Sequence, residues 1–193
     1  MIMSKKKTRF CLAAAAGLLL LGGGILYAKK KSDAVRVQNI VLIQKALDDT
    51  DFWTSVYQGG RMAAVEYNAN LTVKGPANER QVVEQNQMIL EAIAAKPDAV
   101  VLCPCSSEET MPYAEAIEKA GIRLIIADST MDEELGSAVV ATDNYEAGYK
   151  LGSYMKQFVK EDTQIGIVGH VKGSSTATGR EAGFRAGLGE KAS

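Results

Sequence analysis

The sequence has 193 residues, of which 47% are hydrophobic and 23% are charged, which is the composition of an ordinary globular protein. The formal net charge of −1 is unevenly distributed: residues 1–31 hold seven of the 22 Lys and Arg and no acid, which leaves 15 basic against 23 acidic groups in the rest. Nucleic-acid binding needs a basic surface, so this balance argues against DNA or RNA as a partner.

Residues 10–28 form an apolar run of Leu, Ala and Gly between two lysine-rich flanks. This arrangement is typical of an export signal. A helix of this length reaches roughly 28 Å, near the thickness of a bilayer core, so an uncleaved membrane anchor and a cleaved signal peptide both fit. We therefore expect a hydrophobic N-terminal helix over residues 1–31, acting as signal peptide or membrane anchor, and a linker over 32–37. The protein is then extracytoplasmic, either anchored to the cell membrane or secreted to the cell envelope.

Beyond the linker, continuous apolar runs alternate with segments whose apolar residues have helical spacing. The expected strands are 40–43, 71–73, 99–103, 124–127, 137–141 and 165–168, and the expected helices are 52–67, 79–95, 111–120, 145–159 and 180–188. The first four strands recur about every 30 residues, the length of one βαβ unit. The sequence therefore predicts an α/β fold with a doubly wound parallel sheet. Its near-complete N-terminal lobe covers residues 38–142, and an incomplete second lobe covers 143–193.

Ligands of open parallel sheets bind beyond the carboxyl ends of the strands, so the residues that follow each strand are the candidates for a site. They include Lys45, Asp49, Phe52, Trp53, Cys103, Asp128 and Thr142. Aromatic rings can cover the C–H face of a sugar while charged groups bond its hydroxyls, so this mixture favours a sugar or related polyol. Structural roles remain as alternatives: core aromatics in the first helical turn, a surface lysine, and loop or capping roles for the aspartate and the threonine.

Other kinds of site have little support. Cys103 and Cys105 are two residues apart, which suits a disulfide poorly and supplies only half a metal site, and His170 is the single histidine. No dinucleotide-binding glycine pattern follows the first strand, and neither a phosphate loop nor a nucleophile elbow occurs. We therefore expect no metal, no cofactor and no enzymatic activity.

Five segments resemble, in order, parts of the ribose- and galactose-type periplasmic binding proteins, the substrate-binding proteins of sugar ABC transporters with the periplasmic binding protein-like I fold. They are residues 40–60, KPDAVVLCP at 96–104, AGIRLIIADS at 120–129, VVATDNYEAGYKLG at 139–152 and GREAGFRAG at 179–187. The resemblance covers about residues 38–190. It implies a monomer that captures a sugar or polyol and presents it to an ABC permease. The alternative is a membrane-anchored sugar sensor that signals to a membrane sensor kinase or a chemotaxis system.

The resemblance also implies roles for single residues. Phe52 and Trp53 match the aromatics that sandwich the sugar, and Asp128 matches the acid that accepts its hydroxyl hydrogen bonds. Arg180 matches the second-lobe arginine that clamps the ligand. Thr142 matches a serine contact at the first hinge crossing. Lys45 resembles the first-loop lysine of relatives that bind the autoinducer-2 furanone.

Two residues depart from the ribose pattern. Cys103 stands where ribose binders have an amide side chain and Ser129 where they have an arginine, so the ligand is not expected to be bound as ribose is. The family also completes its second lobe and returns to the first with a final strand, which the 193 residues do not contain. We therefore expect the chain as given to bind sugar weakly or not at all.

Overall fold

The computed structural model describes residues 36–48, 50–131, 135–160 and 162–189. The expected signal peptide or anchor over residues 1–31 lies outside these ranges. The described residues from Val37 onward belong to one compact unit. Among the described residues, no helix combines the length and the apolar character that a membrane crossing requires.

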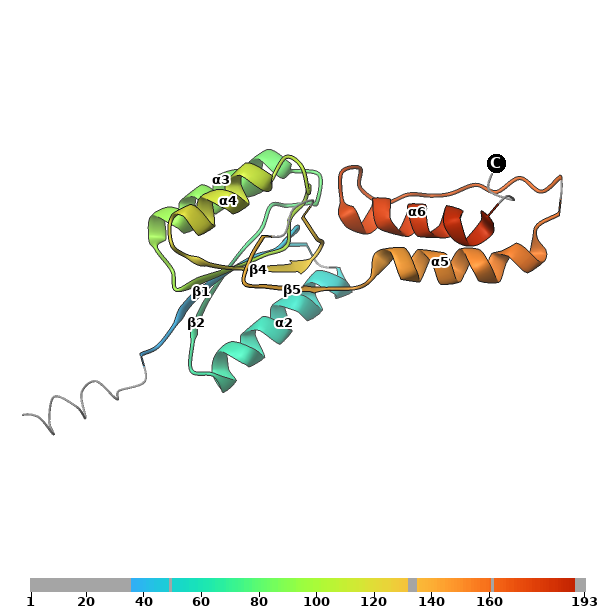
Figure 1. Ribbon diagram of the computed structural model, residues 1–193. Coiled ribbons are helices and arrows are strands. Elements are labelled where there is room, and N and C mark those ends of the chain that lie inside the picture. Colours follow the sequence, from blue (N-terminus) through green and yellow to red (C-terminus); the bar gives the residue numbers. More distant parts are fainter. Residues whose placement is uncertain (1–35, 49, 132–134, 161, 190–193) are drawn as a thin grey trace, which may run out of the picture. The chain divides into compact units, whose positions relative to one another are not determined.

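A sheet of parallel strands forms the centre of this unit. Its members are β1 (Asn39–Ile43), β2 (Asn70–Lys74), β3 (Ala99–Leu102), β4 (Arg123–Asp128) and β5 (Ala138–Ala141). Their order across the sheet is β2-β1-β3-β4-β5, with every neighbouring pair parallel (Figure 1). In this register Ile40 pairs with Leu71 on one side and with Ala99 on the other. The parallel sheet predicted from the apolar runs is confirmed.

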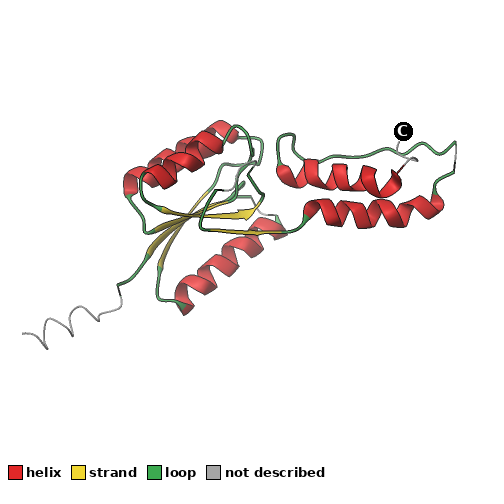
Figure 2. Cartoon of the chain, in the orientation of Figure 1, coloured by secondary structure: helices red, strands yellow, loops and turns green. Residues whose placement is uncertain are grey.

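Helices cover both faces of the sheet. α3 (Val82–Ala95) and α4 (Met111–Lys119) lie on one face, and α2 (Asp51–Glu66) lies on the other (Figures 1 and 2). Successive side chains of β1 divide between the two cores: Val41 and Ile43 pack with α3 and α4, whereas Leu42 packs with Trp53 of α2. This alternation across a strand buried on both sides explains the continuous apolar runs in the sequence.

The chain after β5 forms two helices that pack closely. α5 (Asn144–Met155) is followed by the short 3-10 helix η1 (Lys156–Phe158) and later by α6 (Ser175–Leu188). Asp143 caps α5, since its Oδ1 accepts a hydrogen bond from the Glu146 N–H at 2.8 Å. Glycines on both helices allow a backbone contact that no side chain would permit: a Cβ atom added to Gly183 would lie 2.0 Å from the carbonyl oxygen of Tyr145.

The strand predicted over residues 165–168 is wrong. These residues form neither helix nor strand, and Val168 is 101% exposed. A β-strand exists only through hydrogen bonds to a neighbour, and the described part of the chain places no strand beside this segment. Two predicted helices also begin three or more residues away from the prediction, α3 at Val82 rather than 79 and α6 at Ser175 rather than 180.

Candidate ligand site

The carboxyl ends of β1, β3 and β4 meet at one edge of the sheet. β1 continues into a helix on one face and β3 into a helix on the other, so their adjacent ends form the crevice where doubly wound sheets bind ligands. A cavity of about 560 Å³ lies at this edge. It is lined by Lys45, Asp48, Thr50, Phe52, Trp53, Asn78, Glu79, Arg80, Asp128, His170, Val171, Thr176 and Arg180.

Charges of both signs line the cavity in equal number. The acids are Asp48, Glu79 and Asp128, and the lysine and arginines are Lys45, Arg80 and Arg180. A balanced set of donors and acceptors suits a neutral ligand with many polar groups better than a polyanion, which would require an excess of positive charge.

Lys45 and Asp128 form an ion pair at the base of the cavity. Lys45 is the second residue after β1. Its Nζ lies 2.7 Å from Oδ2 of Asp128, the last residue of β4. The ammonium group also donates hydrogen bonds to Ser129 Oγ and, at 3.3 Å, to Ser174 Oγ. Two of the predicted site residues, far apart in the sequence, are thus brought into direct contact.

The backbone at Asp128 is unusual. Its φ of 65° lies in the left-handed region, which few residues other than glycine adopt, although aspartate tolerates it better than most. The next N–H, that of Ser129, donates to the Ala127 carbonyl at 2.8 Å and closes a tight turn. Strained backbone of this kind concentrates at functional sites. Here the turn ends β4 with its final carboxylate at the cavity.

Phe52 and Trp53 occupy the first turn of α2, but their environments differ. Phe52 is 54% exposed and lines the cavity, whereas Trp53 is 3% exposed and packs against Leu42 and Cys103. The two rings meet edge to face, with centroids 4.9 Å apart. Trp53 therefore combines the core position and the cavity position that the sequence left as alternatives, and Phe52 is the exposed aromatic face.

Glu79 connects Trp53 to the loop before α6. Its Oε1 accepts a hydrogen bond from Trp53 Nε1 at 2.9 Å, and its Oε2 lies 3.0 Å from His170 Nε2. Sequence reasoning assigns no role to this glutamate, because it begins a predicted helix and follows no strand directly. Only its contacts, which come from residues distant in the chain, reveal it.

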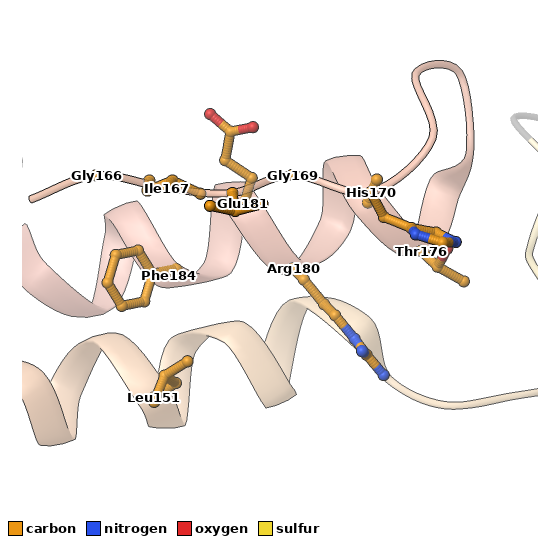
Figure 3. Close-up of a pocket in the computed structure, with 11 residues that line it drawn as sticks. Leu151, Gly166, Ile167, Gly169, His170, Thr176, Arg180, Glu181 and Phe184 are labelled. Carbon is orange, nitrogen blue, oxygen red and sulfur yellow. The ribbon is translucent and has the colours of Figure 1, made fainter.

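Arg180 lies on α6 between two cavities. It lines the cavity at the sheet edge and also a second cavity of about 390 Å³, which lies between α5, α6 and residues 166–170. Figure 3 shows its side chain reaching from α6 toward the first turn of α5, where its Nε donates to Asn144 Oδ1 at 2.9 Å. Glu181 points away from it (Figure 3). The second cavity is lined largely by glycine and apolar side chains, so the sheet-edge cavity carries more hydrogen-bonding groups.

Two of the described candidates from the sequence do not line the sheet-edge cavity. Cys103 is fully buried in the core beneath α2, and Thr142 lines a different, smaller cavity beside Asn144. Asp49 lies outside the described residues. The residues that the structure does bring together there are Lys45, Phe52, Trp53, Asp128 and Arg180.

Gln85 of α3 fixes the loops that follow β1 and β3. This fully buried side chain donates through Nε2 to the carbonyl oxygens of Gln44 at 3.0 Å and Cys103 at 2.9 Å. Its Oε1 accepts from the Cys105 N–H at 2.8 Å. Sequence reasoning missed it, although a glutamine on the apolar face of a helix is the signal that could have found it.

The two described cysteines are buried thiols. Burial, reinforced for Cys103 by the nearby Asp128 carboxylate, raises the pKa of both Cys103 and Cys105 to about 12. Both remain free thiols. Within the described ranges, no group of three or more His, Cys, Asp or Glu is placed to hold a metal ion.

The five-stranded parallel sheet, with a cavity where the chain leaves β1 and β3 toward opposite faces, defines the first lobe of a type I periplasmic binding protein. The chain belongs to the family of the periplasmic binding protein domain, whose model matches residues 40–193. This confirms the resemblance and the fold class inferred from the sequence.

Known relatives bind or transport sugars. A D-ribose/D-allose-binding protein of Pseudomonas aeruginosa is 25% identical over 154 residues, covering 76% of this chain and 48% of that protein. A sugar transporter structure from Clostridium phytofermentans is 39% identical with a TM-score of 0.76, over 81% of this chain and 58% of that one. An ABC transporter solute-binding protein from Agrobacterium vitis, with bound D-fucose, is 29% identical with a TM-score of 0.72, over 78% and 53% of the two chains. The chain thus spans about half the length of these relatives.

Proposed function

We propose that this chain is the ligand-binding part of an extracytoplasmic solute-binding protein that captures a neutral sugar or polyol for an ABC-type importer. The observation that carries the proposal is the cavity at the ends of β1 and β4, which is lined by the exposed ring of Phe52 together with the Lys45–Asp128 pair and Arg180. An aromatic face beside charged donors and acceptors matches the alternating C–H and hydroxyl surface of a sugar. The sugars named for the relatives support the same class of ligand.

The proposal includes a binding role without catalysis. Lys45 pairs with Asp128, Glu79 lies beside His170 and Arg180 donates to Asn144, so these charged groups are engaged within the protein. The named relatives are binding or transport proteins. The apolar run with basic flanks at the N-terminus supports export to the cell envelope, where a binding protein meets its permease.

Saturation-transfer NMR with the 193-residue chain tests the proposal, since it detects weak binding of rapidly exchanging ligands. The panel contains D-ribose, D-allose, D-fucose, D-arabinose and glycerol at millimolar concentration. We expect transfer to at least one sugar, and we expect it to be clearly weaker in the Asp128→Ala variant while circular dichroism shows a retained fold. Glu66→Ala, an exposed acid on α2 away from the cavity, is the matched control. Absence of transfer to every member, or equal transfer in the Asp128→Ala variant, would contradict the proposal.

A further inference from the structure

Lys45 is the charged residue of the cavity most enclosed by the protein. Only 1% of its surface is exposed, although its side chain borders the cavity. Lysine is rarely buried to this extent unless its charge is paired. The resemblance to furanone-binding relatives implies that this lysine contacts the ligand, so its surroundings decide between a contact and another role.

The hydrogen-bonding capacity of Lys45 is fully used within the protein. An ammonium group has three protons and accepts no hydrogen bonds. Its Nζ has three oxygen partners, Asp128 Oδ2, Ser129 Oγ and Ser174 Oγ, which come from two separate segments of the chain. No proton is left to donate to a ligand.

The ion pair leaves one oxygen of Asp128 available. Lys45 engages Oδ2, and the Ser129 hydroxyl lies 3.4 Å from the same atom. No group in the described ranges bonds Oδ1, and the Asp128 side chain, which lines the cavity, is 20% exposed. The lysine thus fixes the carboxylate through one oxygen and leaves the other as a hydrogen-bond acceptor.

The same lysine connects this carboxylate to the start of α6. Ser174 precedes the first residue of α6, and two further bonds join this region to the sheet edge: the Thr130 N–H donates to Ser175 Oγ at 2.9 Å, and the Ser107 N–H donates to the Gly173 carbonyl at 3.2 Å. α6 carries Arg180. Lys45 therefore contacts both the segment that ends in Asp128 and the segment that leads to Arg180.

We infer that Lys45 is a positioning residue that sets Asp128 and the start of α6 for ligand binding and does not itself contact the ligand. This inference rests on the proposed function for its binding arm. The other part of the inference, that protein oxygens use all the hydrogen bonds of Lys45, can be tested without any ligand.

A double-mutant cycle tests the inference on the full chain, with Lys45→Met, Asp128→Ala and the double variant, and with Lys119→Met at an exposed ion pair as control. Without ligand, each single change at the buried pair should lower Tm by more than about 5 °C, because it leaves one unpaired charge. The Tm of the double variant should lie below that of wild type by no more than half the sum of the two single losses. The Tm of the Lys119→Met control should stay near that of wild type. If the two single losses in Tm simply add in the double variant, Lys45 and Asp128 are not coupled and the inference is wrong.

The binding arm uses the sugar of the panel with the lowest Kd for the wild-type chain, measured well below the lowest Tm. We expect Lys45→Met and Asp128→Ala each to raise Kd at least about tenfold, and the double variant to bind no worse than Asp128→Ala alone. Multiplied losses in the double variant would show an independent contact of Lys45 with the sugar. An unchanged Kd in Lys45→Met would show a purely structural lysine. Either result overturns the inference. If the wild-type chain binds no sugar, the proposed function fails, whereas the ligand-free arm still decides whether Lys45 is saturated.

Discussion

Gln85 and Cys103 are joined by a buried hydrogen bond in which Gln85 Nε2 donates to the Cys103 carbonyl across 2.9 Å. With its bonds to Gln44 and Cys105, this side chain satisfies three backbone groups at the ends of β1 and β3. We expect Gln85→Leu to lower the free energy of unfolding by about 2–4 kcal/mol, because these groups would be buried without partners. Urea denaturation followed by circular dichroism measures the change. Gln87→Leu, at an exposed position of the same helix, should change it by less than about 0.5 kcal/mol, and equal losses would contradict the prediction.

Glu79 should stabilise the chain through the indole of Trp53. Glu79→Ala leaves the buried Trp53 N–H without its acceptor, so we expect a loss of about 1–2 kcal/mol in unfolding free energy. Glu79→Gln keeps an oxygen at the same place and should lose less than half as much. Thermal unfolding of the two variants beside wild type gives the comparison. A glutamine variant as unstable as the alanine variant would show that the negative charge, and not the hydrogen bond, is responsible.

Replacement by alanine should have opposite effects at two glycines, one in the contact between α5 and α6 and one on the open surface of α2. A Cβ atom at Gly183 would meet the Tyr145 carbonyl, so Gly183→Ala must push the helices apart and should cost about 2–3 kcal/mol. Gly59 lies inside α2 with no atom near its Cβ position, so Gly59→Ala should stabilise by about 0.5–1 kcal/mol through helix propensity alone. Opposite signs in chemical denaturation are the expected result, and destabilisation by both would refute it.

The raised pKa values of Cys103 and Cys105 predict a loss of stability in alkali. The folded thiols keep their protons up to about pH 12, whereas unfolded thiols ionise from about pH 9, so the unfolded state binds fewer protons between these values and gains stability as pH rises. From pH 8 to pH 10 the two thiols should remove about 2–3 kcal/mol. Unfolding of Cys11→Ser is compared with the same chain carrying Cys103→Ala and Cys105→Ala, which cancels the titration of other groups. Parallel pH profiles for the two chains would disprove the shift.

The sheet and its edge could be predicted from the sequence because both depend on local rules. Apolar runs at a regular spacing indicate buried parallel strands, and the residues that follow the strands, such as Lys45 and Asp128, must then lie at one edge. The same rule wrongly predicts a strand at residues 165–168, because an apolar run shows that a strand can form but not that a neighbouring strand is present. Pairing decides whether the strand forms.

The contacts within the site could not be predicted, because they depend on side chains from distant segments. Lys45 was expected to meet a ligand, and its pairing with Asp128 and Ser174 follows only from the register of the strands and the path of the loop before α6. Trp53 was expected at the cavity, and its burial against Leu42 depends on how the first turn of α2 lies over the sheet. Gln85 and Glu79 lie on or before a helix, where sequence rules for strand ends do not look.

Trp53 is the one tryptophan among the 193 residues, and it borders the cavity while its ring is shielded from water. Intrinsic fluorescence excited selectively at indole wavelengths therefore arises from a single position beside the region where a solute would lodge. The molecule carries its own optical probe, so occupancy can be followed by titration without dyes, isotopes or tags.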